Sequence, residues 1–168
     1  MKIAFLADPL SGFKIYKDST FAMMREAARR GHAIYHFEQR DMVLEEGVVS
    51  ARVAQIHLTG DADEWYRLDP ATDVRLSEFD AIIERKDPPF DMEYVYGTYL
   101  LELAERQGAR VINSPRAIRD HNEKMAIGQF SEHTSPTLVT SDAARLGAFH
   151  AKHTDVIFKP LDGMGGAG

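Results

Sequence analysis

The first forty residues alternate between the apolar pattern of a strand and the periodic pattern of a helix. Residues 2–7 form a short apolar run that is typical of a buried strand, and residues 32–37 form a second one. Between them, Phe21, Met24 and Ala27 recur at helical spacing and predict a helix with one inward face. A strand, a helix and a second strand in this order predict a parallel sheet. The expected fold class is therefore α/β, with a Rossmann-like N-terminal domain.

The next part of the chain interrupts this alternation. Residues 41–58 hold two apolar stretches around a Glu-Glu-Gly turn, which predicts a β-hairpin insertion. Residues 61–77 are polar and irregular, and we expect Trp65 to attach this loop to the body of the domain. Apolar runs at 79–83 and 109–113 then predict that the parallel sheet resumes.

A helix with regular apolar spacing lies between these last two strands and ends at Gly108. Its apolar side chains recur every three or four positions, which predicts that they form the buried face. They are Met92, Val95, Tyr96, Tyr99, Leu100 and Leu103.

The pattern changes again near residue 121, after a helix that starts at Ser114 and Pro115. We expect a helix through Phe130, a strand at 137–140, a helix capped by Ser141 or Asp142, and a last strand at 155–159. This change predicts two units, a complete α/β domain over 1–121 and the incomplete start of a second domain over 122–168.

Composition excludes several classes of function. The net charge is −6 and no block of Lys or Arg is present, which argues against a nucleic-acid partner. No stretch has membrane-spanning length, and the absence of cysteine fits a cytoplasmic protein without disulfides or thiolate metal sites. The seven histidines include no metal-binding spacing, so no metal site is predicted within the chain.

The end of the chain joins a lysine to a glycine-rich loop. Lys159 ends the last expected strand, and glycines at 163, 165 and 166 allow backbone N–H groups to approach phosphate oxygens. The alternative interpretation is a plain turn, because the Walker spacing is absent and the G-x-G-x-x-G pattern ends at Gly168. We expect Lys124 to converge with Lys159 on one polyphosphate.

Ligands of open parallel sheets bind beyond the carboxyl ends of the strands, which singles out loops 8–18, 84–90 and 160–168. In the second of these loops Arg85 follows a strand directly. Its planar guanidinium suits a substrate carboxylate. The structural alternative is that Arg85 pairs with Asp87 or Asp91.

Four segments together resemble bacterial glutathione synthetase, an ATP-grasp ligase family. They read Lys-Asp-Ser-Thr-Phe-Ala-Met at 17–23, Arg-Lys-Asp-Pro-Pro-Phe-Asp at 85–91, Asn-Glu-Lys at 122–124 and Lys-Pro-Leu-Asp-Gly-Met-Gly-Gly-Ala at 159–167. The likeness runs across essentially the whole chain, and the four segments occur in the order of the family. It implies that residues 122–168 are the truncated first part of an ATP-grasp domain.

The resemblance also implies an activity and its residues. ATP would phosphorylate the cysteinyl carboxylate of γ-glutamylcysteine, and the amine of glycine would displace phosphate to give glutathione. Lys124 and Lys159 would contact ATP, Arg85 would bind the dipeptide, and a lid would cover the phosphates, formed by Gly163, Met164, Gly165, Gly166 and Ala167. The ligands of Mg²⁺ would lie beyond residue 168, so the chain alone is expected to be inactive, and the whole protein would be a homotetramer.

Two alternatives stay open at this point. Another ATP-grasp carboxylate–amine ligase, such as a D-alanine ligase or a RimK-like ligase, would share the lysines and the glycine-rich loop. The Arg85 segment is what favours glutathione synthetase. A non-catalytic α/β binding module would instead keep its nucleotide affinity unchanged when Lys124 and Lys159 are replaced by alanine.

Overall fold

The structure is a computed structural model that describes residues 1–163. Its strands are β1 (Lys2–Ala7), β2 (Ala33–Phe37), β3 (Met42–Glu45), β4 (Val48–Leu58), β5 (Tyr66–Leu68), β6 (Thr72–Arg75), β7 (Ala81–Arg85) and β8 (Val111–Ile112). Its α-helices are α1 (Ser19–Arg29), α2 (Met92–Arg106), α3 (Pro115–Asp120) and α4 (Ala143–His153). Short 3₁₀ helices are η1 (Leu10–Gly12), η2 (Gln39–Asp41), η3 (Leu76–Glu78) and η4 (Ala126–His133).

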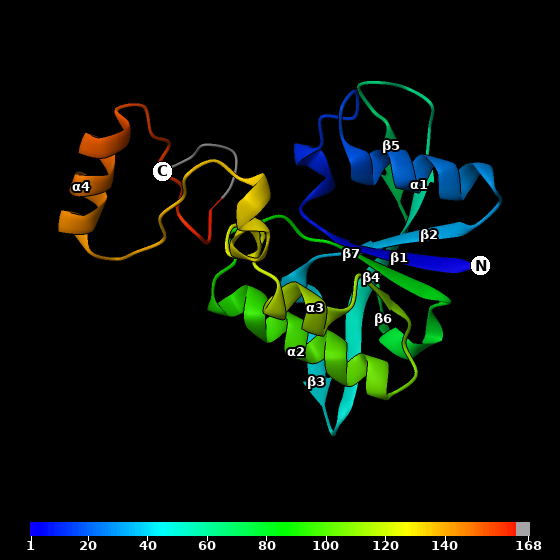
Figure 1. Ribbon diagram of the computed structural model, residues 1–168. Coiled ribbons are helices and arrows are strands. Elements are labelled where there is room, and N and C mark those ends of the chain that lie inside the picture. Colours follow the sequence, from blue (N-terminus) through cyan, green and yellow to red (C-terminus); the bar gives the residue numbers. More distant parts are fainter. Residues whose placement is uncertain (164–168) are drawn as a thin grey trace.

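All strands belong to one sheet, whose main path runs β3-β4-β2-β1-β7-β8. Strands β2, β1, β7 and β8 are parallel to one another, which confirms the predicted Rossmann-like sheet. Helix α1 covers one face of this sheet, and α2 with α3 covers the other (Figure 1). The carboxyl ends of the parallel strands therefore meet at one edge, where the predicted loops 8–18 and 84–90 begin.

The β-hairpin insertion is also confirmed, because β3 and β4 pair in antiparallel register. The prediction of an irregular segment over 61–77 is wrong. Strands β5 and β6 form there and pair with opposite halves of the long strand β4. Both are short and their side chains are half-buried or exposed, so they lack the apolar run that identifies a strand in sequence.

Alternate residues of the central strands pack on opposite faces of the sheet. Phe5 joins the core under α1, whereas Leu6 joins the core under α2. Trp65 lies in the first of these cores and is only 6% exposed. Its ring stacks on Phe13 and meets the edge of Phe21, which confirms that it attaches its loop to the domain.

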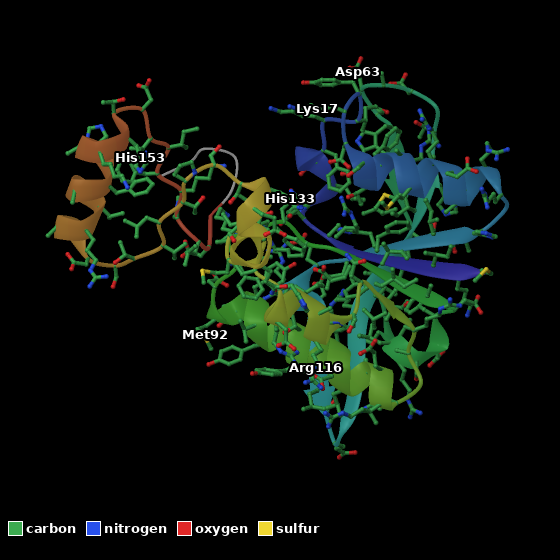
Figure 2. The ribbon with its side chains drawn as sticks, in the orientation of Figure 1. Lys17, Asp63, Met92, Arg116, His133 and His153 are labelled. Carbon is green, nitrogen blue, oxygen red and sulfur yellow. The ribbon has the colours of Figure 1, made fainter. Side chains whose placement is uncertain are left out.

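The predicted buried face of α2 is wrong by about a quarter to a half turn of the helix. Met92, Tyr96 and Tyr99 are more than half exposed, and Figure 2 shows Met92 on the outer side of the helix. The residues that face the sheet are smaller on average: Tyr94, Gly97, Thr98, Leu101 and Ala104. A Cβ at position 97 would lie 3.0 Å from Cδ of Gln39, so glycine leaves room for the Gln39 side chain against the helix.

The part of the chain from 121 to 163 buries no side chain. The expected strands at 137–140 and 155–159 do not form, because no other strand of the described chain pairs with them. The helix through Phe130 is a kinked 3₁₀ segment, η4. Helix α4 is confirmed, with Asp142 accepting from the N–H groups of the first turn, and it lies away from the sheet (Figure 2).

Within residues 1–163, none of the helices combines the length and the apolar composition that crossing a membrane requires.

Candidate functional site at the carboxyl edge of the sheet

The loop 84–90 contacts both of the other segments that were singled out, at Asp8 and at Asp162. Lys86 Nζ forms an ion pair with Asp8 Oδ1 at 2.7 Å, and the N–H of Asp87 donates to Asp8 Oδ2 at 2.9 Å. Directly after the paired prolines, the N–H of Phe90 donates to the carbonyl of Asp162 at 2.8 Å. The loops after β1 and β7 and the segment before the glycines thus form one continuous surface.

Arg85 is the last residue of β7, and its guanidinium lies against the first turn of α1. Nε donates to Thr20 Oγ1 at 3.0 Å, and a terminal nitrogen donates to Ser19 Oγ at 2.7 Å. The predicted alternative, a pair with Asp87 or Asp91, is wrong: within residues 1–163 no carboxylate lies in ion-pair range of this guanidinium. A half-buried cation beside two hydroxyls at a helix N-terminus favours an anion.

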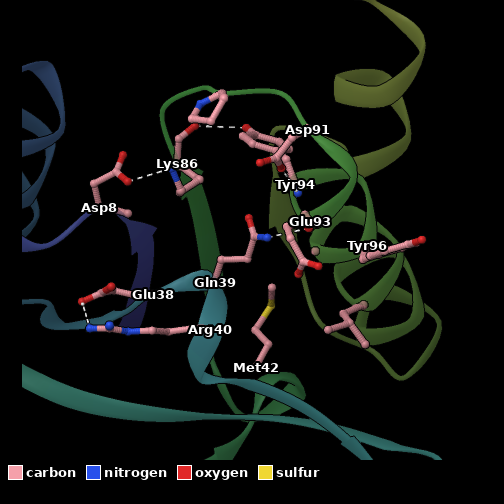
Figure 3. A pocket seen from close by; sticks show the side chains of 14 residues that line it. Asp8, Glu38, Gln39, Arg40, Met42, Lys86, Asp91, Glu93, Tyr94 and Tyr96 are labelled. Carbon is pink, nitrogen blue, oxygen red and sulfur yellow. Dashed lines mark hydrogen bonds and ion pairs between the residues drawn. The ribbon is translucent and has the colours of Figure 1, made fainter. Parts of the chain in front are cut away.

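The neighbours of Arg85 point to the opposite face of the sheet, where a cavity of about 500 Å³ opens beside α2. Figure 3 shows the Asp8–Lys86 pair on one wall and Gln39 reaching across to the backbone of α2. Gln39 Nε2 donates to the carbonyl of Glu93 at 2.5 Å. Both signs of charge line this cavity, which suits a polar occupant.

Beneath the Arg85 loop lies a buried carboxyl group. Glu84 is 6% exposed, and burial raises its pKa to about 7. Its Oε1 lies 3.1 Å from the hydroxyl of Tyr94 and 3.2 Å from the N–H of Lys86. Burial and the neighbouring Glu84 carboxylate also raise the pKa of Tyr94. This pair joins the loop to α2.

A second cavity, of about 180 Å³, lies where the Pro88–Phe90 segment meets the end of the described chain. Lys124 lines it, and its ammonium donates to the carbonyl of Gly163 at 2.6 Å and to Glu123 Oε1 at 2.9 Å. Lys159 is exposed and is not among the residues that line this cavity. The convergence of the two lysines therefore stays a prediction, and Met164, Gly165, Gly166 and Ala167 lie outside the described residues.

Sequence reasoning missed several groups of this edge. Ser19 and Thr20 were given no role in a site; they follow Asp18, which caps α1 by accepting from the N–H of Phe21. Glu84 was placed in the loop 84–90 and given no role, whereas it is a buried residue of β7. Among residues 1–163, no three His, Cys, Asp or Glu side chains gather as metal ligands.

Two family models match the chain in succession. Residues 1–119 match the model described as "Prokaryotic glutathione synthetase, N-terminal domain". Residues 123–168 match the one described as "Prokaryotic glutathione synthetase, ATP-grasp domain". A solved structure of the ATP-grasp ligase PsnB with a minimal precursor aligns at a TM-score of 0.48 and 22% identity, over 97% of this chain and 54% of that one.

Curated relatives align along the entire chain. Glutathione synthetase of Ralstonia nicotianae is 63% identical over 100% of this chain and 52% of that protein. The enzyme of Nitrosomonas europaea is 53% identical over 100% and 53%, and that of Neisseria meningitidis is 49% identical over 100% and 54%. The chain thus spans about half the length of these relatives. Since the first model alone matches residues 1–119 of 168, the chain belongs to the prokaryotic glutathione synthetase family.

Proposed function

We propose that this chain is the N-terminal half of a glutathione synthetase, which joins γ-glutamylcysteine to glycine at the expense of ATP. The observation that carries the proposal is the match of the whole chain to glutathione synthetases at up to 63% identity. In this proposal the chain alone is inactive, because the ligands of the Mg²⁺ that neutralises the transferring phosphate lie beyond residue 168. We place the boundary between its two units near residue 121.

At the dipeptide end, Arg85 binds a carboxylate of γ-glutamylcysteine. The support is its position between the hydroxyls of Ser19 and Thr20, at the N-terminus of α1, without a carboxylate partner among the described residues. An incoming carboxylate accepts hydrogen bonds from the fork of Arg85, and the hydroxyl groups hold that fork in orientation.

At the nucleotide end, Lys124 and Lys159 bind phosphate oxygens of ATP, and Gly163, Met164, Gly165, Gly166 and Ala167 cover them. The support for Lys124 is the contact of its ammonium with the carbonyl of Gly163, which places this cation beside the start of the glycine-rich segment. The positive charge then neutralises part of the phosphate charge.

The reaction proceeds in two steps. A carboxylate oxygen of the cysteinyl residue attacks the γ-phosphorus, the bond to the β–γ bridging oxygen breaks, and ADP leaves. The glycine amine then attacks the acyl carbon, its proton is lost, and inorganic phosphate leaves with the former carboxylate oxygen. The residues of this chain contribute position and charge rather than a nucleophile, which is sufficient for phosphoryl transfer.

We further propose that the whole protein uses Mg²⁺ with ligands beyond residue 168, works in the cytoplasm and assembles as a homotetramer, as the family resemblance implies. Loss of activity with a chelator and its recovery with Mg²⁺ test the first point. Sedimentation of the whole protein tests the last.

The decisive experiment supplies the whole protein with ATP, Mg²⁺, γ-glutamylcysteine and glycine, and identifies the product by mass spectrometry. Glutathione is expected, with one phosphate released per peptide bond. Parallel reactions replace γ-glutamylcysteine and glycine by D-alanine, or by glutamate with a peptide acceptor. A preference for either replacement, or phosphate release that ignores glycine, contradicts the proposal in favour of another ATP-grasp ligase.

A further inference from the structure

Asn122 lies in the turn between α3 and η4, and its side-chain amide makes three contacts. Its Oδ1 accepts from the N–H of Lys124 at 3.0 Å and from the N–H of Met125 at 3.1 Å. Its Nδ2 donates to the carbonyl of Leu161 at 2.9 Å. One side chain therefore fixes the turn that carries Lys124 and also holds a segment 39 positions along the chain.

The contacts require asparagine. The turn needs an acceptor, and Leu161 needs a donor, so only one orientation of the amide satisfies all partners. Aspartate retains the acceptor but places a negative oxygen against the carbonyl of Leu161. Alanine loses both functions. Asn122→Asp therefore removes the contact to Leu161 and keeps the two contacts within the turn, whereas Asn122→Ala removes all three.

Three consecutive carbonyls, those of residues 161–163, each accept a hydrogen bond from a different part of the chain. Leu161 accepts from Asn122, Asp162 accepts from the N–H of Phe90, and Gly163 accepts from the ammonium of Lys124. The first donor is a short side chain and the second is backbone, so both are held in place. The third is the tip of a long, flexible side chain.

This arrangement has a consequence for a ligand that binds Lys124. If the ammonium transfers to a phosphate, Gly163 loses its donor, and the segment is then held by the contacts to Leu161 and Asp162 alone. We propose that Asn122 is a positioning residue for the nucleotide: it keeps Leu161–Gly163 beside Lys124 while the ammonium is engaged by phosphate. The inference rests on the proposed function and assigns a residue to it.

The Phe90 contact reaches the same segment from the Arg85 loop and does not involve Asn122. Loss of the Asn122 contact is therefore expected to affect the binding of ATP beside Lys124 and to leave the binding of the dipeptide at Arg85 unchanged. The expected signature is a change in the KM of ATP without a change in the KM of γ-glutamylcysteine. Substitution of a merely structural residue would change both KM values, or would lower the stability of the protein instead.

The test compares Asn122→Asp with Asn113→Asp in the whole protein. The sequence has asparagine at these two positions only, and Asn113 is exposed and makes no side-chain hydrogen bond within residues 1–163. Asn122→Asp is expected to raise the KM of ATP about tenfold, as the loss of one well-made hydrogen bond implies. Asn113→Asp adds the same charge and is expected to leave the KM of ATP within twofold of the wild-type value.

An unchanged KM of ATP in Asn122→Asp, or an equal rise in the KM of the dipeptide, overturns the inference. Should Asn122→Asp not fold, Asn122→Ser, which keeps a short acceptor and lacks the NH₂ group, is measured and interpreted in the same way. Wild-type protein that makes no glutathione refutes the proposed function itself, whereas an active wild type with an unaffected variant refutes only the role of Asn122.

Discussion

The hydroxyl of Tyr94 lies 3.1 Å from the carboxyl oxygen Oε1 of Glu84 and 3.0 Å from the carbonyl of Lys86. A phenol has one proton, so it donates to one of these oxygens at a time. When Glu84 is protonated, its own O–H donates to Tyr94, and Tyr94 donates to Lys86. The neutral carboxyl therefore satisfies both contacts, and it ties the loop after Arg85 to α2.

Glu84→Gln is expected to remove a pH dependence of stability. Burial raises the pKa of Glu84 from 4.5 to about 7. Between these values the folded chain holds a proton that the unfolded chain has released, so this group's stabilisation is full below pH 4.5 and is lost as pH rises through 7. At about 1.4 kcal/mol per pH unit, the loss is about 3 kcal/mol.

Urea denaturation of the wild type and of Glu84→Gln at pH 5, 6, 7 and 8 measures this pH dependence of stability. The free energy of unfolding of Glu84→Gln minus that of the wild type should grow with pH and level off above pH 7. A constant difference across the series would show that Glu84 titrates normally.

Arg85→Lys in the whole protein is expected to raise the KM of γ-glutamylcysteine at least tenfold, with the KM of ATP within twofold. Lysine keeps the charge but lacks the fork that meets both the hydroxyls and a carboxylate. The measurement is steady-state phosphate release. Arg116→Lys is the matched control, because Arg116 is exposed on α3 and, within residues 1–163, forms an ion pair with Asp120 alone. Equal effects of the two substitutions would rule out a role for Arg85 in binding.

Leu101→Ala and Met92→Ala test the orientation of α2. Leu101 is 1% exposed and its truncation should cost about 2–5 kcal/mol of unfolding free energy, whereas Met92 is 58% exposed and should cost less than about 0.5 kcal/mol. Chemical denaturation measures both. A larger cost at Met92 would support the inner face inferred from apolar spacing and contradict the observed one.

Trp65→Ala should destabilise the chain by about 3–5 kcal/mol, because it removes the ring that Phe13, Phe21 and Tyr66 contact. The chain has one tryptophan, so unfolding is followed by circular dichroism rather than by its fluorescence. Tyr16→Ala, at a site 81% exposed, is the control and should change stability little. Comparable losses of stability in Trp65→Ala and Tyr16→Ala would mean that contacts other than those of Trp65 hold the loop.

The parallel strands were predictable because each is an apolar run with a turn signal after it, as in Lys2–Ala7 and Ala81–Arg85. Strands β5 and β6 were not, since their formation depends on the free edges of β4 rather than on their own residues. The segments at 137–140 and 155–159 show the opposite case, in which strand-like residues have no partner within the described chain.

The site was predictable at the level of loops, because topology brings the ends of parallel strands together. The partners of individual side chains were not. Arg85 had two acidic residues nearby in sequence, yet strand geometry turns it to the α1 face, where Ser19 and Thr20 meet it. For α2 the bulky apolar residues were misleading, since Met92, Tyr96 and Tyr99 are exposed while the smaller Gly97, Thr98 and Ala104 are buried.

The most direct test of the central claim uses γ-glutamylcysteine with ¹⁸O in its cysteinyl carboxylate and the whole protein with ATP and glycine. If ATP activates that carboxylate as an acyl phosphate, each inorganic phosphate released carries one ¹⁸O. Phosphate that contains only ¹⁶O, formed together with glutathione, would contradict the account.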